Sequence, residues 1–219
     1  EICHKGIHYT ILSDTTVELT RADTLYVGGV SVPDFVAGEG TKYKVVSVAD
    51  NAFYRCMRTN YVMLPPTVKR IGDYAFRGCS LLTALTIPNS VTSIGDSAFK
   101  NCTSLKSITI PDGMSSIGFY VLENCTSLTS IIIPVSVTSI GEDAFSGCSA
   151  LKTVYYGGTA EDWNAISINP YYDNSDLTDA TRYYYSATQP TEADKYWHYV
   201  NGVPVVWEVV TGSQGLEYT

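Results

Sequence analysis

The chain has 219 residues, 45% of them hydrophobic, and a formal net charge of −8, so it can bury a sizeable core. The acidic balance argues against nucleic acid as a partner, and no apolar run approaches the ~18 residues that a membrane-spanning helix needs. Because the sequence begins at Glu1 rather than Met, we expect its authentic start to have been removed, and any export signal with it.

Residues 1–47 have the pattern of a β-rich N-terminal cap. Apolar and polar side chains alternate over residues 7–12 and again over 17–20, which predicts a β-hairpin. The segment VSVPDFV, which starts at Val30, resembles the end of a later repeat and predicts a degenerate half-coil. A glycine-rich turn then predicts a second hairpin from Phe35 to Val46. Such a cap would cover the open end of a stacked sheet.

From Val48 to Tyr156 the sequence repeats every 23 residues, in five copies. One copy reads VTSIGDSAFKNCTSLKSITIPDG. A fixed period in this range predicts a solenoid, in which each unit buries its apolar face against its neighbours. Three sets of residues occupy equivalent positions of the repeat. The first set is Ile71, Ile94, Ile117 and Ile140, each followed by glycine. The second set is Phe53, Phe76, Phe99, Leu122 and Phe145, and the third is Leu82, Leu105, Leu128 and Leu151.

Each repeat carries signals for two extended pieces and the turns between them. Ile108 and Ile110 alternate with Ser107 and Thr109, which predicts a strand packed on one face. A second extended piece precedes Gly95, which we expect to allow a bend. One turn position alternates between asparagine (101, 124) and glycine (78, 147), as a left-handed backbone position requires. Stacking of equivalent strands predicts a parallel sheet.

Five of the six cysteines occupy one repeat position. Stacked coils place equivalent Cα atoms ~4.8 Å apart, which suits a disulfide, but parallel side chains would leave the Cβ atoms farther apart than the preferred ~3.8 Å. An odd number also cannot pair completely. We therefore expect a ladder of buried free thiols, whereas Cys3 has no assigned role. The ladder residues are Cys56, Cys79, Cys102, Cys125 and Cys148.

The repeat I-G-x-x-A-F-x-x-C-x-x-L-x-x-I-x-I-P resembles the BspA-type leucine-rich repeat of bacterial secreted and surface proteins. The resemblance covers residues 48–156, with departures at Leu122 and Thr59, and it fails at Tyr156-Gly157, where we expect the solenoid to end. It implies a mainly β, right-handed leucine-rich-repeat solenoid. It also implies an extracellular or bacterial cell-surface protein that works through binding, often adhesion to host or neighbouring cells.

Residues 157–181 are predicted to form a C-terminal cap helix and a loop. Thr159 is a predicted N-cap, and Trp163 with Ile166 would pack on the end of the solenoid. The loop carboxylates, Asp173, Asp176 and Asp179, lack the spacing of a calcium-binding loop. Residues 182–219 form an aromatic-rich tail, in which Asn201-Gly202 predicts a two-residue hairpin turn within a small appended sheet. The chain from Thr211 onward is expected to be frayed.

The sequence offers little for catalysis. No nucleophile motif, phosphate loop or dinucleotide fingerprint is present. His4 and His8 lie near Cys3, but on a predicted strand start rather than a helix face, so we do not predict a metal site there. The repeated thiols point into the core, where the reactive thiolate is disfavoured. We therefore expect no enzyme activity, no metal and no cofactor.

The favoured hypothesis is a non-catalytic recognition or adhesion module that binds a protein through the concave solenoid face. Exposed large side chains on a rigid wall typify protein-binding surfaces, although threonine and serine ladders also simply suit stacked strands. The partner would be a host matrix or cell-surface protein.

The alternatives are a glycan-binding module that uses the C-terminal aromatics, and a structural spacer. Seven basic residues between Lys42 and Arg77 mark either an anionic partner or solvated coil edges. The protein-binding candidates are Tyr61, Met63, Thr86, Lys106, Ser107, Thr109, Ile132 and Tyr155, and the glycan-binding candidates are Tyr184, Trp197, Tyr199 and Trp207.

Overall fold

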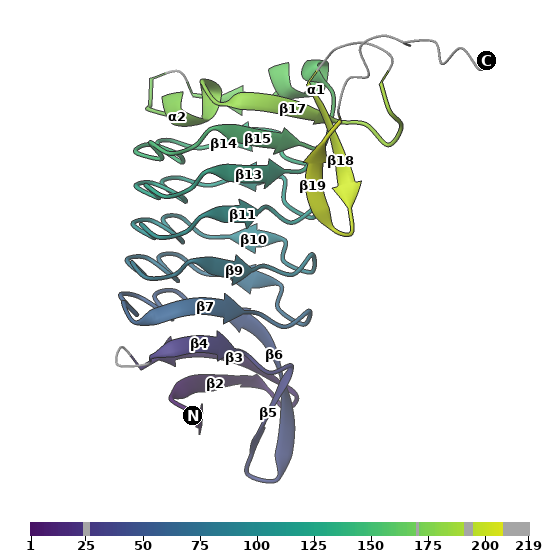
Figure 1. Cartoon of the computed structure of the whole chain (residues 1–219). Coiled ribbons are helices and arrows are strands. Elements are labelled where there is room, and N and C mark those ends of the chain that lie inside the picture. The colour runs from purple at the N-terminus through teal and green to yellow at the C-terminus, as the bar shows by residue number, and fades with distance from the viewer. Residues whose placement is uncertain (24–26, 170, 191–194, 208–219) are drawn as a thin grey trace, which may run out of the picture.

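The computed structural model describes residues 1–23, 27–169, 171–190 and 195–207. Expectations for the segment from Thr211 onward lie outside these residues. Figure 1 shows one column of stacked coils, with the N-terminal hairpins at one end and two short helices at the other. This architecture confirms the predicted leucine-rich-repeat solenoid. Neither described helix has the length and apolar character that crossing a membrane requires.

The N-terminal cap contains both predicted hairpins. The first pairs β2 (Ile7–Ser13) with β3 (Thr16–Ala22), and β1 (Ile2–His4) adds an unpredicted third strand against β2. The second pairs β5 (Phe35–Gly38) with β6 (Thr41–Val48). Parallel stacking already begins within this cap, because β3 pairs with β6 and β4 (Gly28–Ser31) pairs with β7 (Thr59–Met63).

The repeats form two walls of short parallel strands. Partners in the ladders are 23 residues apart, as in the pairs Ser107↔Ser130 and Ser116↔Ser139, so the predicted register is confirmed. The longer-stranded wall contains β7, β9 (Ala84–Thr86), β11 (Ser107–Thr109), β13 (Ser130–Ile133) and β15 (Thr153–Tyr156). The opposite wall contains β8 (Arg70–Ile71), β10 (Ser93–Ile94), β12 (Ser116–Ile117) and β14 (Ser139–Ile140).

The core between the walls is a set of side-chain columns. The ring of Phe76 stacks between those of Phe53 and Phe99, with centroid distances of 4.8 and 5.6 Å. The five ladder cysteines are buried and unpaired, as predicted. The Cys102 thiol donates to the carbonyl oxygen of Phe76 at 3.2 Å, and the equivalent bond recurs up the column. Burial raises the pKa of Cys102 well above its ordinary value, so this thiol stays neutral.

Two details of the turns were predicted differently or missed. The chain turns after Gly95, but this glycine has no positive φ; instead, a Cβ there would overlap Asp73 Oδ1 and lie 2.5 Å from the backbone nitrogen of Asp73. The position therefore needs glycine because adjacent coils approach closely. The asparagine and glycine positions have positive φ as expected, but a second left-handed position was missed because its residue type varies between the copies: Asn51, Tyr74, Ser97, Tyr120 and Asp143.

The parallel stack extends one coil beyond Tyr156, where the sequence analysis placed its end. β16 (Ser167–Ile168) pairs with β14, and β17 (Thr181–Tyr185) pairs with β15. This coil contains α1 (Ala160–Asn164), for which the predicted N-cap Thr159 forms a capping box with Asp162. It also contains α2 (Ser175–Thr178), in a segment predicted to be loop. The preceding Asn174 ties this helix to the stack by accepting from Phe145 N at 3.1 Å and donating to Gly141 O at 3.0 Å.

The C-terminal hairpin continues the solenoid sheet. It consists of β18 (Tyr196–Val200) and β19 (Val203–Val206), joined at Asn201-Gly202, and both turn residues have the positive φ that this turn requires. The predicted appended sheet is continuous with the solenoid sheet, because β18 pairs in parallel with β17. In Figure 1 the hairpin (yellow) runs back along the stack toward β13 and β11.

Candidate functional site

The outward side chains of β7, β9 and β11 form a continuous exposed surface, which we call the open face. Its large apolar members lie at one end, where Tyr61 is 44% and Met63 49% exposed. The ladder places Met63 directly beside Thr86. The ring of Tyr61 lies over Gly29, where any Cβ would overlap it, so the missing side chain of Gly29 leaves room for the ring. The structure thus brings together six of the predicted protein-binding residues: Tyr61, Met63, Thr86, Lys106, Ser107 and Thr109, all exposed.

The two remaining predicted residues, Ile132 and Tyr155, are partly covered, which corrects their expected exposure. The tip of the β18–β19 hairpin, residues 202–204, lines a hollow together with β11 and β13. The ring of Tyr155 packs against Tyr183 at 6.0 Å and against Trp197 at 5.4 Å. The hairpin therefore ends the open face at about β13.

The predicted glycan-binding aromatics do not form one platform. Trp197 is 1% exposed, and its Nε1 donates to Tyr156 O at 2.8 Å, so it is a packing residue. Trp207 stacks on His198 with centroids 3.6 Å apart. Tyr184 packs edge-on against Tyr156 in the last coil. Among the four candidates Tyr199 is the most exposed, at 47%, so these four residues do not form one flat surface on which a sugar ring could stack.

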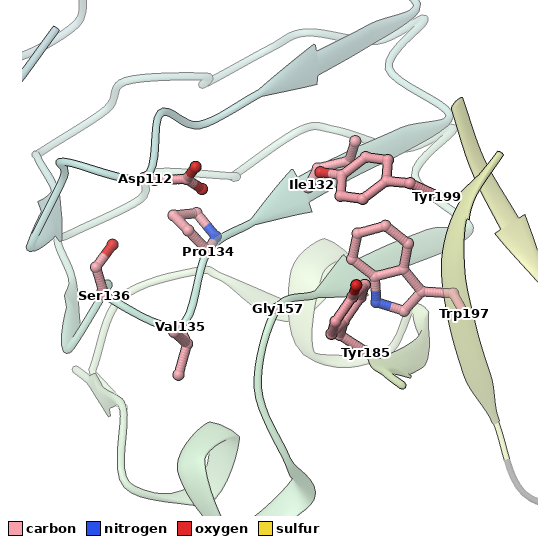
Figure 2. A pocket seen from close by; sticks show the side chains of 9 residues that line it. All are labelled: Asp112, Ile132, Pro134, Val135, Ser136, Gly157, Tyr185, Trp197 and Tyr199. Atoms are coloured by element: carbon pink, nitrogen blue, oxygen red, sulfur yellow. The ribbon is translucent and has the colours of Figure 1, made fainter. Parts of the chain in front are cut away.

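A separate cavity of about 220 Å³ lies where the hairpin meets the coils. Figure 2 shows aromatic rings on one side and the loop side chains of two coils on the other. Sequence reasoning missed this site, because its two sides come from distant parts of the chain and only the fold joins them. The lining residues are Asp112, Ile132, Pro134, Val135, Ser136, Gly157, Tyr185, Trp197 and Tyr199.

Five of the seven basic residues between Lys42 and Arg77 contact an aromatic ring or a carboxylate of the same chain. The Lys42 ammonium lies 4.4 Å from the ring centroid of Phe35, and the Arg77 guanidinium lies 5.4 Å from that of Tyr74. Arg70 pairs with Asp50 at 2.7 Å. These contacts favour solvated coil edges over an anion-binding patch.

Within residues 1–23, 27–169, 171–190 and 195–207, no group of three or more His, Cys, Asp or Glu side chains is placed to hold a metal ion. His8 instead contacts Glu1 Oε1 at 3.0 Å and lies 3.9 Å from the Cys3 thiol, on the exposed side of the N-terminal hairpin. What the geometry offers is therefore two surfaces suited to binding: the open face and the cavity.

Comparison with known proteins agrees with this architecture. Residues 46–178 match the family model of the BspA-type leucine-rich repeat region, in six copies. The chain is similar to a leucine-rich repeat protein of T. pallidum, with 34% identity, a TM-score of 0.63 and coverage of 71% of each chain. A leucine-rich cell surface protein of Faecalibacterium prausnitzii is 32% identical with a TM-score of 0.66, over 75% of this chain but 41% of that one. A leucine-rich repeat protein of Bacteroides capillosus is 26% identical with a TM-score of 0.53, over 72% of this chain and 98% of that one. No curated protein matches the chain.

Proposed function

The chain belongs to the family of BspA-type leucine-rich repeat proteins, and from this premise we propose that it is a non-catalytic module that binds a protein partner outside a bacterial cell. Repeat solenoids present extended rigid surfaces suited to such binding. The similar Faecalibacterium protein is a cell surface protein, which supports a location at the bacterial surface. A host matrix or cell-surface protein is the proposed partner class.

The observation that carries this proposal is the open face. Its strands belong to stacked coils with a continuous core, so the surface is rigid before any partner arrives. Tyr61 and Met63 give it an exposed apolar end, and Ser107 with Thr109 give it a hydroxyl-rich opposite end. Apolar anchors beside adaptable polar groups are typical of protein interfaces. Lys106 adds a positive charge at the edge, and rim charges mainly affect the association rate and specificity.

The test introduces a large charged side chain at each end of the open face. Partners captured from host matrix and from bacterial surface proteins are first identified with the unaltered chain, and a glycan array is run in parallel. Surface plasmon resonance then compares Met63→Arg and Thr109→Arg with Ser93→Arg, a control on the exposed side of the opposite wall. We expect at least about a tenfold loss of affinity for the first two variants, equivalent to ~1.4 kcal/mol, and none for the control.

Circular dichroism should show that all three variants remain folded, because each changed side chain is exposed. If Met63→Arg and Thr109→Arg both bind like the unaltered chain, the open face is not the binding surface. If no protein or glycan binds and the substitutions change only stability, the chain acts as a structural spacer.

A further inference from the structure

We propose that the cavity between the β18–β19 hairpin and the coils binds an organic ammonium group, with Asp112 and the exposed rings of Tyr185 and Tyr199, held by the buried Trp197, as the recognition elements. This site is distinct from the open face and goes beyond the protein-binding function proposed above.

The aromatic side of the cavity is a corner of three rings. The ring of Trp197 meets that of Tyr185 at 71° with centroids 5.3 Å apart, and that of Tyr199 at 75° with centroids 4.9 Å apart. The bond from Trp197 Nε1 to Tyr156 O at 2.8 Å fixes the indole, whereas both tyrosines remain largely exposed. A group placed in this corner would contact more than one π system at once. Aromatic corners and cages of this kind attract cations, because each ring face carries a negative electrostatic potential.

The opposite side of the cavity supplies a negative charge. Asp112 lies across from the rings in Figure 2. Among the described residues Asp112 forms no ion pair, and its carboxylate accepts a hydrogen bond from Asn89 Nδ2 at 3.4 Å. Burial, and then the charges of Asp112 and Tyr185, raise the pKa of Tyr199. A cation in the cavity would be attracted from both sides.

The size and lining of the cavity narrow the ligand class. Drug-sized ligands occupy pockets of about 300–1,000 Å³, so a cavity of about 220 Å³ suits a small group such as a trimethylammonium or an alkylammonium. The lining residues include no lysine or arginine to hold an anion. Besides Asp112 and the tyrosines, Ser136 is the remaining polar side chain, which is too few for the many hydroxyls of a sugar.

The test compares a cation with a neutral molecule of the same shape. Isothermal titration of the full chain at low salt uses choline and 3,3-dimethylbutan-1-ol, in which carbon replaces the charged nitrogen. We expect saturable choline binding and an affinity for the alcohol that is lower by about tenfold or more, the upper range of cation–π attraction. The second arm of the test uses Nα-acetyl-lysine amide, which keeps the charged side-chain ammonium. If it binds more tightly than choline, the source of the ammonium group is a lysine side chain of a protein.

Substitutions test whether choline binds in this cavity. Asp112→Asn should lower choline affinity about tenfold by removing the charge while keeping the shape, and Tyr199→Leu should also weaken it. Asp14→Asn, in the turn of the N-terminal hairpin, is the matched control and should change nothing. The proposal is overturned if the alcohol binds as well as choline, if Asp112→Asn binds choline unchanged, or if neither ammonium compound binds. Binding of N-acetylglucosamine without any response to choline would also overturn it.

Discussion

Replacing Trp197 with alanine tests whether the C-terminal hairpin is anchored by this one buried side chain. The indole is 1% exposed and contacts the rings of Tyr155, Tyr185 and Tyr199. Truncating a buried aromatic side chain to alanine costs about 3–5 kcal/mol of unfolding free energy. Loss of the hydrogen bond from Nε1 to Tyr156 O adds about 0.5–1.5 kcal/mol.

The effect of Trp197→Ala should be local. β18 joins the solenoid through a ladder of two residue pairs with β17, Tyr184↔Tyr196 and Tyr185↔Trp197, whereas each coil packs on a neighbour through its own core. Elements with few buried contacts open at lower free energy than the core of a fold. We therefore expect the hairpin to detach while the coils stay folded.

Hydrogen exchange followed by mass spectrometry measures this detachment. Protection of residues 196–206 should fall at least about a hundredfold in Trp197→Ala, since ~2.7 kcal/mol of local stability corresponds to that factor. Peptides from β8 to β15 should be unchanged. Tyr199→Ala is the control, because its ring is 47% exposed, and it should lose much less protection. Unchanged protection of the hairpin in Trp197→Ala would refute the anchoring role, and loss of protection throughout the chain would refute the separability of the hairpin.

Two further predictions concern the stack itself. Gly95→Ala should lower the unfolding free energy by about 1–3 kcal/mol through overpacking, because the new Cβ would lie 2.5 Å from Asp73 N. The control Gly113→Ala, whose Cβ would lie 3.2 Å from Thr92 Cγ2, should cost less. Equal midpoints of the two variants in guanidinium unfolding would contradict this prediction. Burial raises the pKa of Cys79 from 9.0 to about 12, so its thiol ionises first in the unfolded chain. The stability that the folded chain gains from keeping this thiol neutral is therefore fully present below pH 9. As the pH rises from 9 to 12, this part of the unfolding free energy is lost by about 1.4 kcal/mol per pH unit. Urea unfolding at several pH values should show a shallower decline for Cys79→Ala, and identical slopes would contradict the prediction.

The features that were predictable from sequence are those encoded locally or between adjacent coils. The 23-residue period fixes which residues stack, so the buried phenylalanine column and the cysteine ladder follow from the spacing. Asn201-Gly202 predicts its turn because both residues tolerate positive φ. The first N-terminal hairpin likewise follows from alternation of apolar and polar residues, and the second follows from its glycine-rich turn.

The features that were missed depend on contacts between segments that differ in sequence. The last coil pairs Thr153 with Thr181, so it is longer than 23 residues, and its two helices hide it from a search for the repeat. Asn174 holds the last coil on the preceding one through hydrogen bonds rather than through an apolar side chain at a repeat position. The 23-residue spacing therefore gives no sign of this contact. Exposure of Ile132 and Tyr155 was overestimated because their own repeats are regular, and the hairpin that covers them comes from another part of the chain.

The hairpin is the element that connects the two proposed binding surfaces. It supplies two of the rings of the cavity, and its tip limits the open face at β13. The cavity requires the hairpin in place, whereas the open face does not, because β7, β9 and β11 are held by the coils alone. Detaching the hairpin would therefore remove the ammonium site and uncover Ile132 and Tyr155 together. Substitution at Met63 should therefore affect the open face alone, and substitution at Asp112 should affect the ammonium site alone. A change at Trp197 that detaches the hairpin should remove the ammonium site and at the same time extend the open face.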